Sequence, residues 1–388
     1  MQNKIAENAL KQRLATISNT NPSDWFLVSR ARHGMTVVLG AVANYSNKGE
    51  VVTQAFTCIT AVNPILATGH KPIYCDITEY NLSLDSAKLA KTISPKTRAV
   101  IAQHTFGCTS DLQSIASLLH QKAPSALLLE DSAHCLGMLA KSGGKVIADV
   151  SFHSFGAEKL LPTSFGGAVW VNPAMKNVEL RAKIISQLSQ LPRMSLASQF
   201  QTWLYKPLNS TLNRLPNQLS QPLRKIGTTL KILVTPVMPA ELLGVNFDQP
   251  ARLTNLVTRQ LLRNIENYSR ICEHRKTISQ IYARGLRRKG AVIPGAVAKQ
   301  NLPFVRFPVI LASAESNELF TRLKINRMNP GKWYRPLLFP GTSNPALYGY
   351  NSKSSPIAED VSARIINLPT GLGITVKRAK EILDEVNR

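Results

Sequence analysis

Six short apolar runs that alternate with amphipathic stretches constrain the fold of this chain more than any other feature. We expect a β-strand over each run: VVTQA (51–55), KPIYCDI (71–77), RAVIAQH (98–104), ALLLED (126–131), VSFHSF (150–155) and GGAVWVN (166–172). Between two of them, residues 110–121 repeat leucine and isoleucine at helical spacing. Strands that alternate with helices predict a mainly parallel sheet covered on both faces. Ligands of such sheets bind beyond the carboxyl ends of the strands.

The rest of the chain follows other patterns. Residues 196–240 combine leucines, prolines and basic residues with no acidic residue before Glu241, which predicts short amphipathic helices broken at proline. We expect a long helix over about 251–286 and another over 375–387. Residues 301–349 are rich in proline and aromatic residues, and we expect strands and loops there.

The charge balance favours anionic partners. The chain has 47 Lys and Arg against 23 Asp and Glu, a formal net charge of +24. Such an excess suits nucleotides, phosphorylated sugars, nucleic acid or anionic lipid without selecting among them. Nucleic acid is the less expected partner because no helix-turn-helix or aromatic-basic RNA motif is evident. The basic segment 196–240 could lie on anionic lipid, bind a substrate diphosphate, or pack as helices with a solvated basic face, and we favour the last.

The cysteines and the N-terminal residues indicate a cytoplasmic protein. The five cysteines are well separated and form no C-x-x-C pair, which fits reduced thiols. The first residues lack the apolar core of a signal peptide, and no apolar run is long enough to span a bilayer. We expect no metal.

Asp131 closes the run ALLLED, at the expected carboxyl end of a strand. A carboxylate in this position can cap the following helix, and taken alone the position favours that role. It can also pair with a cationic ring nitrogen, and burial would strengthen such a pair by lowering the local dielectric constant.

Two basic features are further candidates for a site. Lys159 precedes Gly166 and Gly167; such a lysine is usually exposed, but a desolvated one has a lowered pKa and can form a Schiff base with an aldehyde. The segment SRARHGM (29–35) leads into a helical stretch, and the N-terminus of a helix suits a phosphate. An ordinary solvated basic turn is equally consistent with this segment.

These features belong to an ordered set of segments: AFTCITAVNPILATGHKPIYCDI (55–77), TRAVIAQHTFGCTSDL (97–112), EDSAHCLG (130–137), SFGAEKLLPTSFGGAVWVN (154–172), GVNFDQPARL (244–253) and INLPTGLGIT (366–375). The set resembles the DegT/DnrJ/EryC1/StrS family of sugar aminotransferases, which have the fold-type I architecture. The resemblance implies a large domain over 1–250 with a mainly parallel seven-stranded sheet, and a smaller C-terminal α+β domain over 251–388. It does not cover roughly 177–240, which we interpret as a basic helical insertion.

The resemblance also implies a cofactor, pyridoxal 5′-phosphate (PLP), and roles for named residues. Lys159 would hold PLP covalently, and Asp131 would pair with its ring nitrogen. His134 would lie beside the cofactor. Ser154 would bind its phosphate together with the backbone at Ala31 and Arg32. Asn246 matches an asparagine that reaches the phosphate of the partner subunit, which implies a homodimer with shared active sites.

Several positions depart from the family pattern. Cys58 stands where an aromatic residue often stacks on the cofactor ring, and either His104 or Phe56 could replace that residue. Ala31 and Arg32 stand where a Gly-Thr pair is usual, so a hydroxyl is missing. Trp333, Tyr334 and Arg335 match a substrate loop of the family, although we slightly favour a packing role for them.

The resemblance implies that the chain transfers an amino group from an amino acid, with glutamate the expected donor, to a keto-sugar that we expect to be nucleotide-linked. The product would serve polysaccharide or glycoconjugate biosynthesis. The alternative is a catalytically altered or regulatory protein of the same fold that binds an anionic partner, and that alternative would also explain the basic charge.

Overall fold

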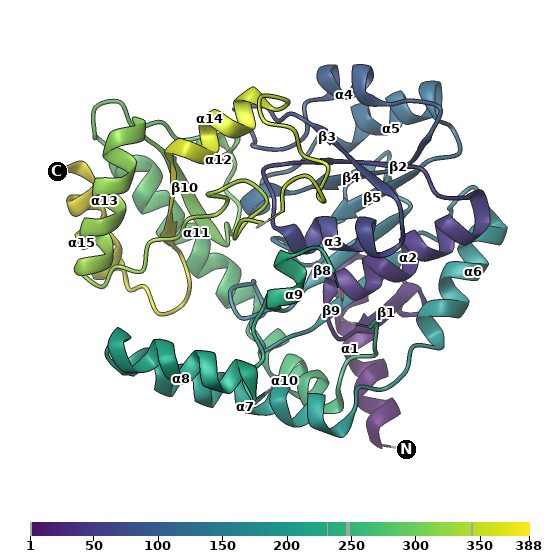
Figure 1. Ribbon diagram of the computed structural model, residues 1–388, viewed down its shortest axis with the longest axis horizontal. Helices are drawn as coiled ribbons and strands as arrows, with labels where there is room; N and C mark the ends of the chain where they lie inside the picture. Colours follow the sequence, from purple (N-terminus) through teal and green to yellow (C-terminus); the bar gives the residue numbers. More distant parts are fainter. Residues whose placement is uncertain (1, 231, 246–248, 343) are drawn as a thin grey trace.

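A seven-stranded sheet forms the centre of the N-terminal part of the chain in this computed structural model, which describes residues 2–230, 232–245, 249–342 and 344–388 (Figure 1). The strand order is β1 (Trp25–Val28), β9 (Gly167–Val171), β8 (Val150–Ser154), β5 (Leu127–Asp131), β4 (Thr97–Gln103), β2 (Glu50–Gln54) and β3 (Lys71–Cys75). Strand β9 is antiparallel to both of its neighbours, whereas the other paired strands run parallel. The six predicted strands and the mainly parallel sheet are confirmed; β1, with only four residues, was not predicted.

Helices cover both faces of this sheet, as predicted, because the residues that point to each face of its strands are mostly apolar and buried. Phe26 and Val28 of β1 join a core with α2 (Ala31–Ser46), α3 (Ile59–Ala67) and α6 (Val178–Ser189). Trp25 and Leu27 point the other way, into a core with α1 (Gln2–Ser18) and α10 (Asn255–Ile265). On that same face, farther along the sheet, α4 (Ser86–Thr92) and α5 (Leu112–Lys122) pack on β4 and β5. The remaining short elements are η1 (Pro22–Asp24), η2 (Thr105–Gly107), β6 (Lys141–Ser142) and β7 (Lys145–Val146).

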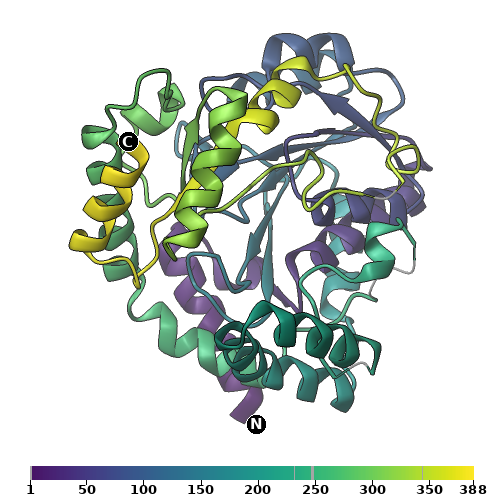
Figure 2. The ribbon, with the colours of Figure 1, turned by 60° about the vertical axis from the view of Figure 1, so that its left-hand side comes forward.

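The C-terminal part has its own small sheet and its own core. Strands β10 (Arg306–Ile310) and β11 (Ile365–Pro369) pair antiparallel. Helices α11 (Tyr268–Gly285), α12 (Gly295–Lys299), α13 (Ser313–Ile325) and α15 (Val376–Asn387) surround them, and α14 (Pro356–Arg364) leads into β11. Figure 2 shows this part beside the larger sheet. The domain boundary at 250 stays a prediction, and the structure places α10 against α1.

Two expectations for the C-terminal half were wrong in part. The single helix expected over 251–286 is two helices, α10 and α11, separated at Glu266 and Asn267. Helix α10 buries its apolar face against α1, whereas α11 begins in that same core and then enters the C-terminal core at Ile278. Residues 301–349 also contain helix α13, whose Leu319 and Leu323 lie one turn apart and are fully buried.

The segment 196–240 is helical and is broken at proline, as predicted, although not at every proline. Helices α7 (Leu196–Arg214) and α8 (Asn217–Thr229) lie side by side, followed by α9 (Pro239–Leu242) (Figures 1 and 2). Pro207 and Pro222 lie inside α7 and α8, and both are exposed. The chain turns instead at Pro216, because a residue that precedes proline is driven to extended backbone, as Leu215 is with ψ 150°.

Candidate active site

A cavity of about 620 Å³ lies beyond the carboxyl ends of β4, β5 and β8. The walls also include the start of α2, the loop after β8, one side of α7 and the loop before α14. Seven of the eight predicted site residues line this one cavity: Ala31, Arg32, Cys58, Asp131, His134, Ser154 and Lys159. Asn246 lies outside the described residues. The structure therefore brings together residues that are up to 128 positions apart (159 − 31).

Asp131 and Lys159 form an electrostatically coupled pair in this cavity. Burial raises the pKa of Asp131, and the nearby Lys159 ammonium partly opposes that rise. Burial likewise lowers the pKa of Lys159, and Asp131 partly opposes that fall. The Asp131 carboxylate accepts a hydrogen bond from the Ala133 N–H at 2.9 Å, so it also caps its own turn, as the alternative interpretation expected. Burial thus shifts both pKa values in the direction that favours the neutral side chain, which suits a lysine nucleophile and a carboxylate that binds a cation.

His134 is held as a neutral ring in one tautomer. The Phe106 N–H donates to its Nδ1 at 2.9 Å, and its Nε2 lies 3.0 Å from the Tyr334 hydroxyl. A nitrogen that accepts cannot carry the proton, so the proton lies on Nε2 and is donated to Tyr334. Burial lowers the pKa of His134 well below its ordinary value, and the charge on Lys159 lowers it further.

The start of α2 provides backbone donors at one end of the cavity. Helix α2 begins at Ala31, and its first N–H groups have no acceptor within the helix. The start of α2 can lie close to β9 because residue 167 is glycine, and a Cβ there would lie 2.5 Å from the Ala31 nitrogen. Ser154, at the end of β8, lines the same cavity. Such a cradle of N–H groups and a hydroxyl has the chemistry of a phosphate site.

The side chain of Arg32 is already engaged. Its guanidinium lies 3.0 Å from the Glu241 carboxylate and donates to the Pro236 carbonyl at 2.5 Å. Arg30 also donates to the Pro236 carbonyl, at 3.2 Å, and stacks on Phe165 at 4.2 Å. These arginines therefore fasten α2 to the segment that follows α8, and Arg32 would meet a phosphate through its backbone N–H.

Neither proposed replacement for an aromatic at Cys58 lines the cavity. Phe56 is fully buried and packs edge-on against Tyr334 at 5.4 Å. The His104 ring lies 2.9 Å from the Glu130 carboxylate, and both side chains are fully buried. Phe56 was too deep and His104 was already paired, so both expectations were wrong.

The flat surface next to the lysine comes from His134 and Trp333 instead. Their rings are 5.2 Å apart and almost parallel, at 8°, and the Lys159 ammonium lies 4.9 Å from the Trp333 ring centre. Trp333 and Tyr334 line the cavity, so a packing role describes them incompletely. Arg335 donates to Asn317 at 2.7 Å, away from the cavity.

Two groups of lining residues were missed from the sequence. Gln103 ends β4 directly opposite Asp131 in the sheet register, and it accepts a hydrogen bond from Thr57 at 2.5 Å. The strand-end rule that selected Asp131 could have found Gln103. Tyr205 and Asn209 come from α7, inside the segment that the resemblance does not cover, and no sequence signal placed them here.

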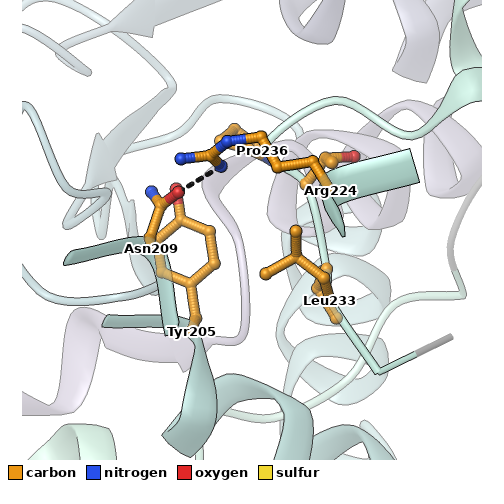
Figure 3. A pocket seen from close by; sticks show the side chains of 7 residues that line it. Tyr205, Asn209, Arg224, Leu233 and Pro236 are labelled. Atoms are coloured by element: carbon orange, nitrogen blue, oxygen red, sulfur yellow. Dashed lines mark hydrogen bonds between the residues drawn. The ribbon is translucent and has the colours of Figure 1, made fainter. Parts of the chain in front are cut away.

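A second pocket of about 360 Å³ adjoins the first and shares Tyr205, Asn209 and Pro236 with it. Figure 3 shows the Arg224 guanidinium of α8 reaching the Asn209 side chain of α7, at 2.5 Å, beside the Tyr205 ring. This bond ties the two helices together at the edge of the candidate site.

Two curated proteins illustrate what this chain is similar to in sequence. A GDP-perosamine synthase from Vibrio cholerae is 25% identical over 371 residues, covering 91% of this chain and 85% of the relative. A dTDP-4-amino-4,6-dideoxy-D-glucose transaminase from Shigella dysenteriae is 28% identical over 158 residues, 40% of this chain and 41% of that protein.

Among solved structures, the apo-form of the putative sugar aminotransferase Spr1654 from Streptococcus pneumoniae superposes with a TM-score of 0.74 at 18% identity, covering 98% of this chain and 89% of that one. Its PLP-form superposes with a TM-score of 0.73. These likenesses confirm the fold-type I architecture. A family model matches residues 26–387. The chain belongs to the DegT/DnrJ/EryC1/StrS aminotransferase family.

Proposed function

We propose that this aminotransferase uses PLP, held by Lys159, to move an amino group from an amino acid to a keto-sugar carried on a nucleotide. Glutamate is the donor that we expect, and polysaccharide or glycoconjugate biosynthesis is the expected context. The observation that carries the proposal is that Lys159 and Asp131 line one cavity of about 620 Å³ and act electrostatically on each other.

The residues present fit this cofactor. A lysine of lowered pKa suits the aldehyde, a buried carboxylate suits a cationic ring nitrogen, and the start of α2 suits the phosphate. Gly167 provides a further argument, because a side chain there would push α2 away from the strand ends. When bound, PLP supplies an electron sink for charge that develops on the carbon next to the transferred nitrogen.

Each residue would then have a defined task. The Asp131 carboxylate would keep the ring nitrogen protonated, and its burial would strengthen that pairing because the local dielectric constant is low. The Lys159 amine, once free, would move a proton between the substrate carbon and the cofactor carbon, since its lowered pKa leaves a larger neutral fraction. His134, held neutral, would add no charge beside the ring.

The names of the relatives support a nucleotide-linked sugar and glutamate. GDP-perosamine synthase and a dTDP-amino-sugar transaminase are named for nucleotide sugars. A UDP-4-amino-4-deoxy-L-arabinose–oxoglutarate aminotransferase from Shewanella sediminis, 32% identical over 158 residues, is named for oxoglutarate, the keto acid that glutamate becomes. The net charge of +24 is consistent with an anionic substrate. A homodimer with shared sites and a cytoplasmic location complete the proposal.

Purified protein tests the first step. We expect a yellow protein, and reduction with borohydride should add the mass of the cofactor to the peptide that contains Lys159. Lys159→Ala should take no such label, whereas Lys145→Ala, an exposed lysine outside the cavity, should label like the wild type. Colourless protein that retards DNA at physiological salt would contradict the proposal and favour a binding protein.

The acceptor is tested by a half-reaction. Protein loaded with pyridoxamine phosphate would be mixed with a panel of nucleotide-linked keto-sugars, and recovery of the original absorbance would identify the acceptor. Recovery with simple keto acids alone would contradict a sugar acceptor while leaving the aminotransferase in place.

A further inference from the structure

Helix α8 turns its apolar side toward solvent. Leu219, Leu223, Ile226 and Leu230 are 57%, 47%, 54% and 63% exposed. Their spacing of four, three and four residues puts them along one side of the helix. The opposite side is polar where it meets the protein: Ser220 is buried, and Arg224 bonds to Asn209 of α7. An amphipathic helix in a globular protein normally faces the other way.

Helix α7 has an outward apolar side as well. Leu196, Phe200 and Trp203 are 84%, 58% and 54% exposed, at spacings of four and three residues, and the Phe200 and Trp203 rings lie 5.8 Å apart. Its opposite side carries Tyr205 and Asn209, which line the active-site cavity. We refer to the exposed apolar residues of both helices as the α7–α8 face: Leu196, Phe200, Trp203, Leu219, Leu223, Ile226 and Leu230.

The charged residues of the segment that carries this face are all basic. Residues 196–240 contain no Asp or Glu, and they contain five basic residues: Lys206, Arg214, Arg224, Lys225 and Lys231. Arg214 and Lys225 are exposed among the described side chains. Two copies of this face in a two-fold contact would bring like charges together, because such a contact joins the same patch on both subunits. An anionic surface would instead be complementary to it.

We propose that the α7–α8 face binds an anionic lipid membrane, with its apolar side chains in the interface and its basic side chains at the lipid headgroups. Within the part of the chain that the structure describes, no helix is long and apolar enough to cross a membrane. The contact is therefore peripheral. It does not depend on which reaction the cavity catalyses.

Vesicle flotation of the full-length protein tests this proposal. We expect it to float with vesicles of phosphatidylcholine and phosphatidylglycerol, to float less as salt rises, and to stay behind with phosphatidylcholine alone. The variant L219Q/L223Q/I226Q should lower the partition coefficient by roughly tenfold or more. The matched control V178Q/I325Q/L372Q removes side chains that are 70%, 73% and 51% exposed elsewhere, and it should bind like the wild type.

Trp203 gives a second readout that does not depend on the triple variant folding. Brominated phosphatidylglycerol should quench wild-type tryptophan fluorescence, and Trp203→Phe should remove most of the quenching, because Trp25 and Trp170 are buried and Trp333 lines the active-site cavity. Failure of the wild type to float with anionic vesicles would overturn the proposal, as would equal flotation with neutral ones. Light scattering that shows the triple variant changing from dimer to monomer would assign the face to a second copy of the chain.

Discussion

Lys159 and Asp131 show how burial changes the chemistry of single residues. In water one would be a cation and the other an anion. In this cavity burial lowers the pKa of Lys159 and raises the pKa of Asp131, and the charge of each residue opposes the pKa shift of the other. A ring nitrogen that carries a proton would give Asp131 a second positive partner and favour its ionised form. Lys159 alone does not offset the effect of burial on the pKa of Asp131, so a cationic ligand would stabilise the Asp131 carboxylate further.

Asp131→Asn tests that interpretation. The amide keeps an oxygen for the Ala133 N–H, so the turn should survive, but it cannot hold a proton on the ring nitrogen. We expect kcat/KM to fall by about 10²-fold or more, while the melting temperature changes little. The control is Asp149→Asn, a carboxylate outside the cavity, which should keep its activity. Equal activities for the two variants would remove Asp131 from the mechanism.

Asp149 itself provides a prediction for stability against pH. Burial raises its pKa from 3.8 to about 6, so folding favours its protonated form. The protonated carboxyl of Asp149 contributes fully to the free energy of unfolding below about pH 4. That contribution is lost as the pH rises from about 4 through 6, so the free energy of unfolding is lower by up to about 3 kcal/mol above pH 6. Asp149→Asn should therefore raise the free energy of unfolding at pH 7 and leave it unchanged at pH 4. Parallel pH profiles for variant and wild type would contradict this assignment.

At the scale of elements, the contact between α2 and β9 positions the expected phosphate site. The N-terminus of α2 reaches the strand ends because β9 has no side chain at Gly167. The helix is then held from the other side by Arg30 and Arg32, which both donate to the Pro236 carbonyl. Helix α2, which would present backbone N–H groups to the expected phosphate, is thus held in place by β9 on one side and by the Pro236 carbonyl on the other.

Gly167→Ala tests this contact. Its Cβ would lie 2.5 Å and 2.7 Å from the Ala31 nitrogen and Cα, which are backbone atoms that cannot rotate away. We expect a loss of about 1–3 kcal/mol in the free energy of unfolding and weaker retention of PLP on dialysis. Gly373→Ala is the control, because nothing lies within 4 Å of its Cβ position. If both variants retain PLP equally, the α2 terminus is not the phosphate site.

At the scale of the whole molecule, residues from both halves of the chain line one cavity. One core lies under the seven-stranded sheet, and another lies around β10 and β11. Trp333 and Tyr334 extend from the C-terminal half into the cavity that the sheet ends form. The whole molecule also carries a net charge of +24, and repulsion among its excess positive charges destabilises the compact, folded state.

Added salt should therefore stabilise this protein. Screening of that repulsion predicts a melting temperature that rises between low and physiological sodium chloride. Sulfate at equal ionic strength should raise it further if it binds at the basic sites. A melting temperature that falls as sodium chloride is added would show that attractive ion pairs outweigh the repulsion.

Much of the sheet half could be predicted from local pattern. Runs such as ALLLED and GGAVWVN are short and uniformly apolar, and their strands are buried on both faces, so the pattern and the structure follow from the same cause. The break at Glu266 could not be predicted, because apolar spacing continues through it and the two helices differ only in the core that the later part of α11 enters.

The sequence alone determined the parallel sheet, its helical cover and the residues Asp131 and Lys159, because strand periodicity and an ordered set of motifs are local properties of the chain. Only the tertiary structure decided which surfaces enclose the site. Trp333 lies 174 positions from Lys159 (333 − 159), and Tyr205 and Asn209 come from α7, a helix in the segment that the family resemblance does not cover. Such contacts depend on how separate elements pack in space, and the spacing of residues along the chain does not predict which of them come together.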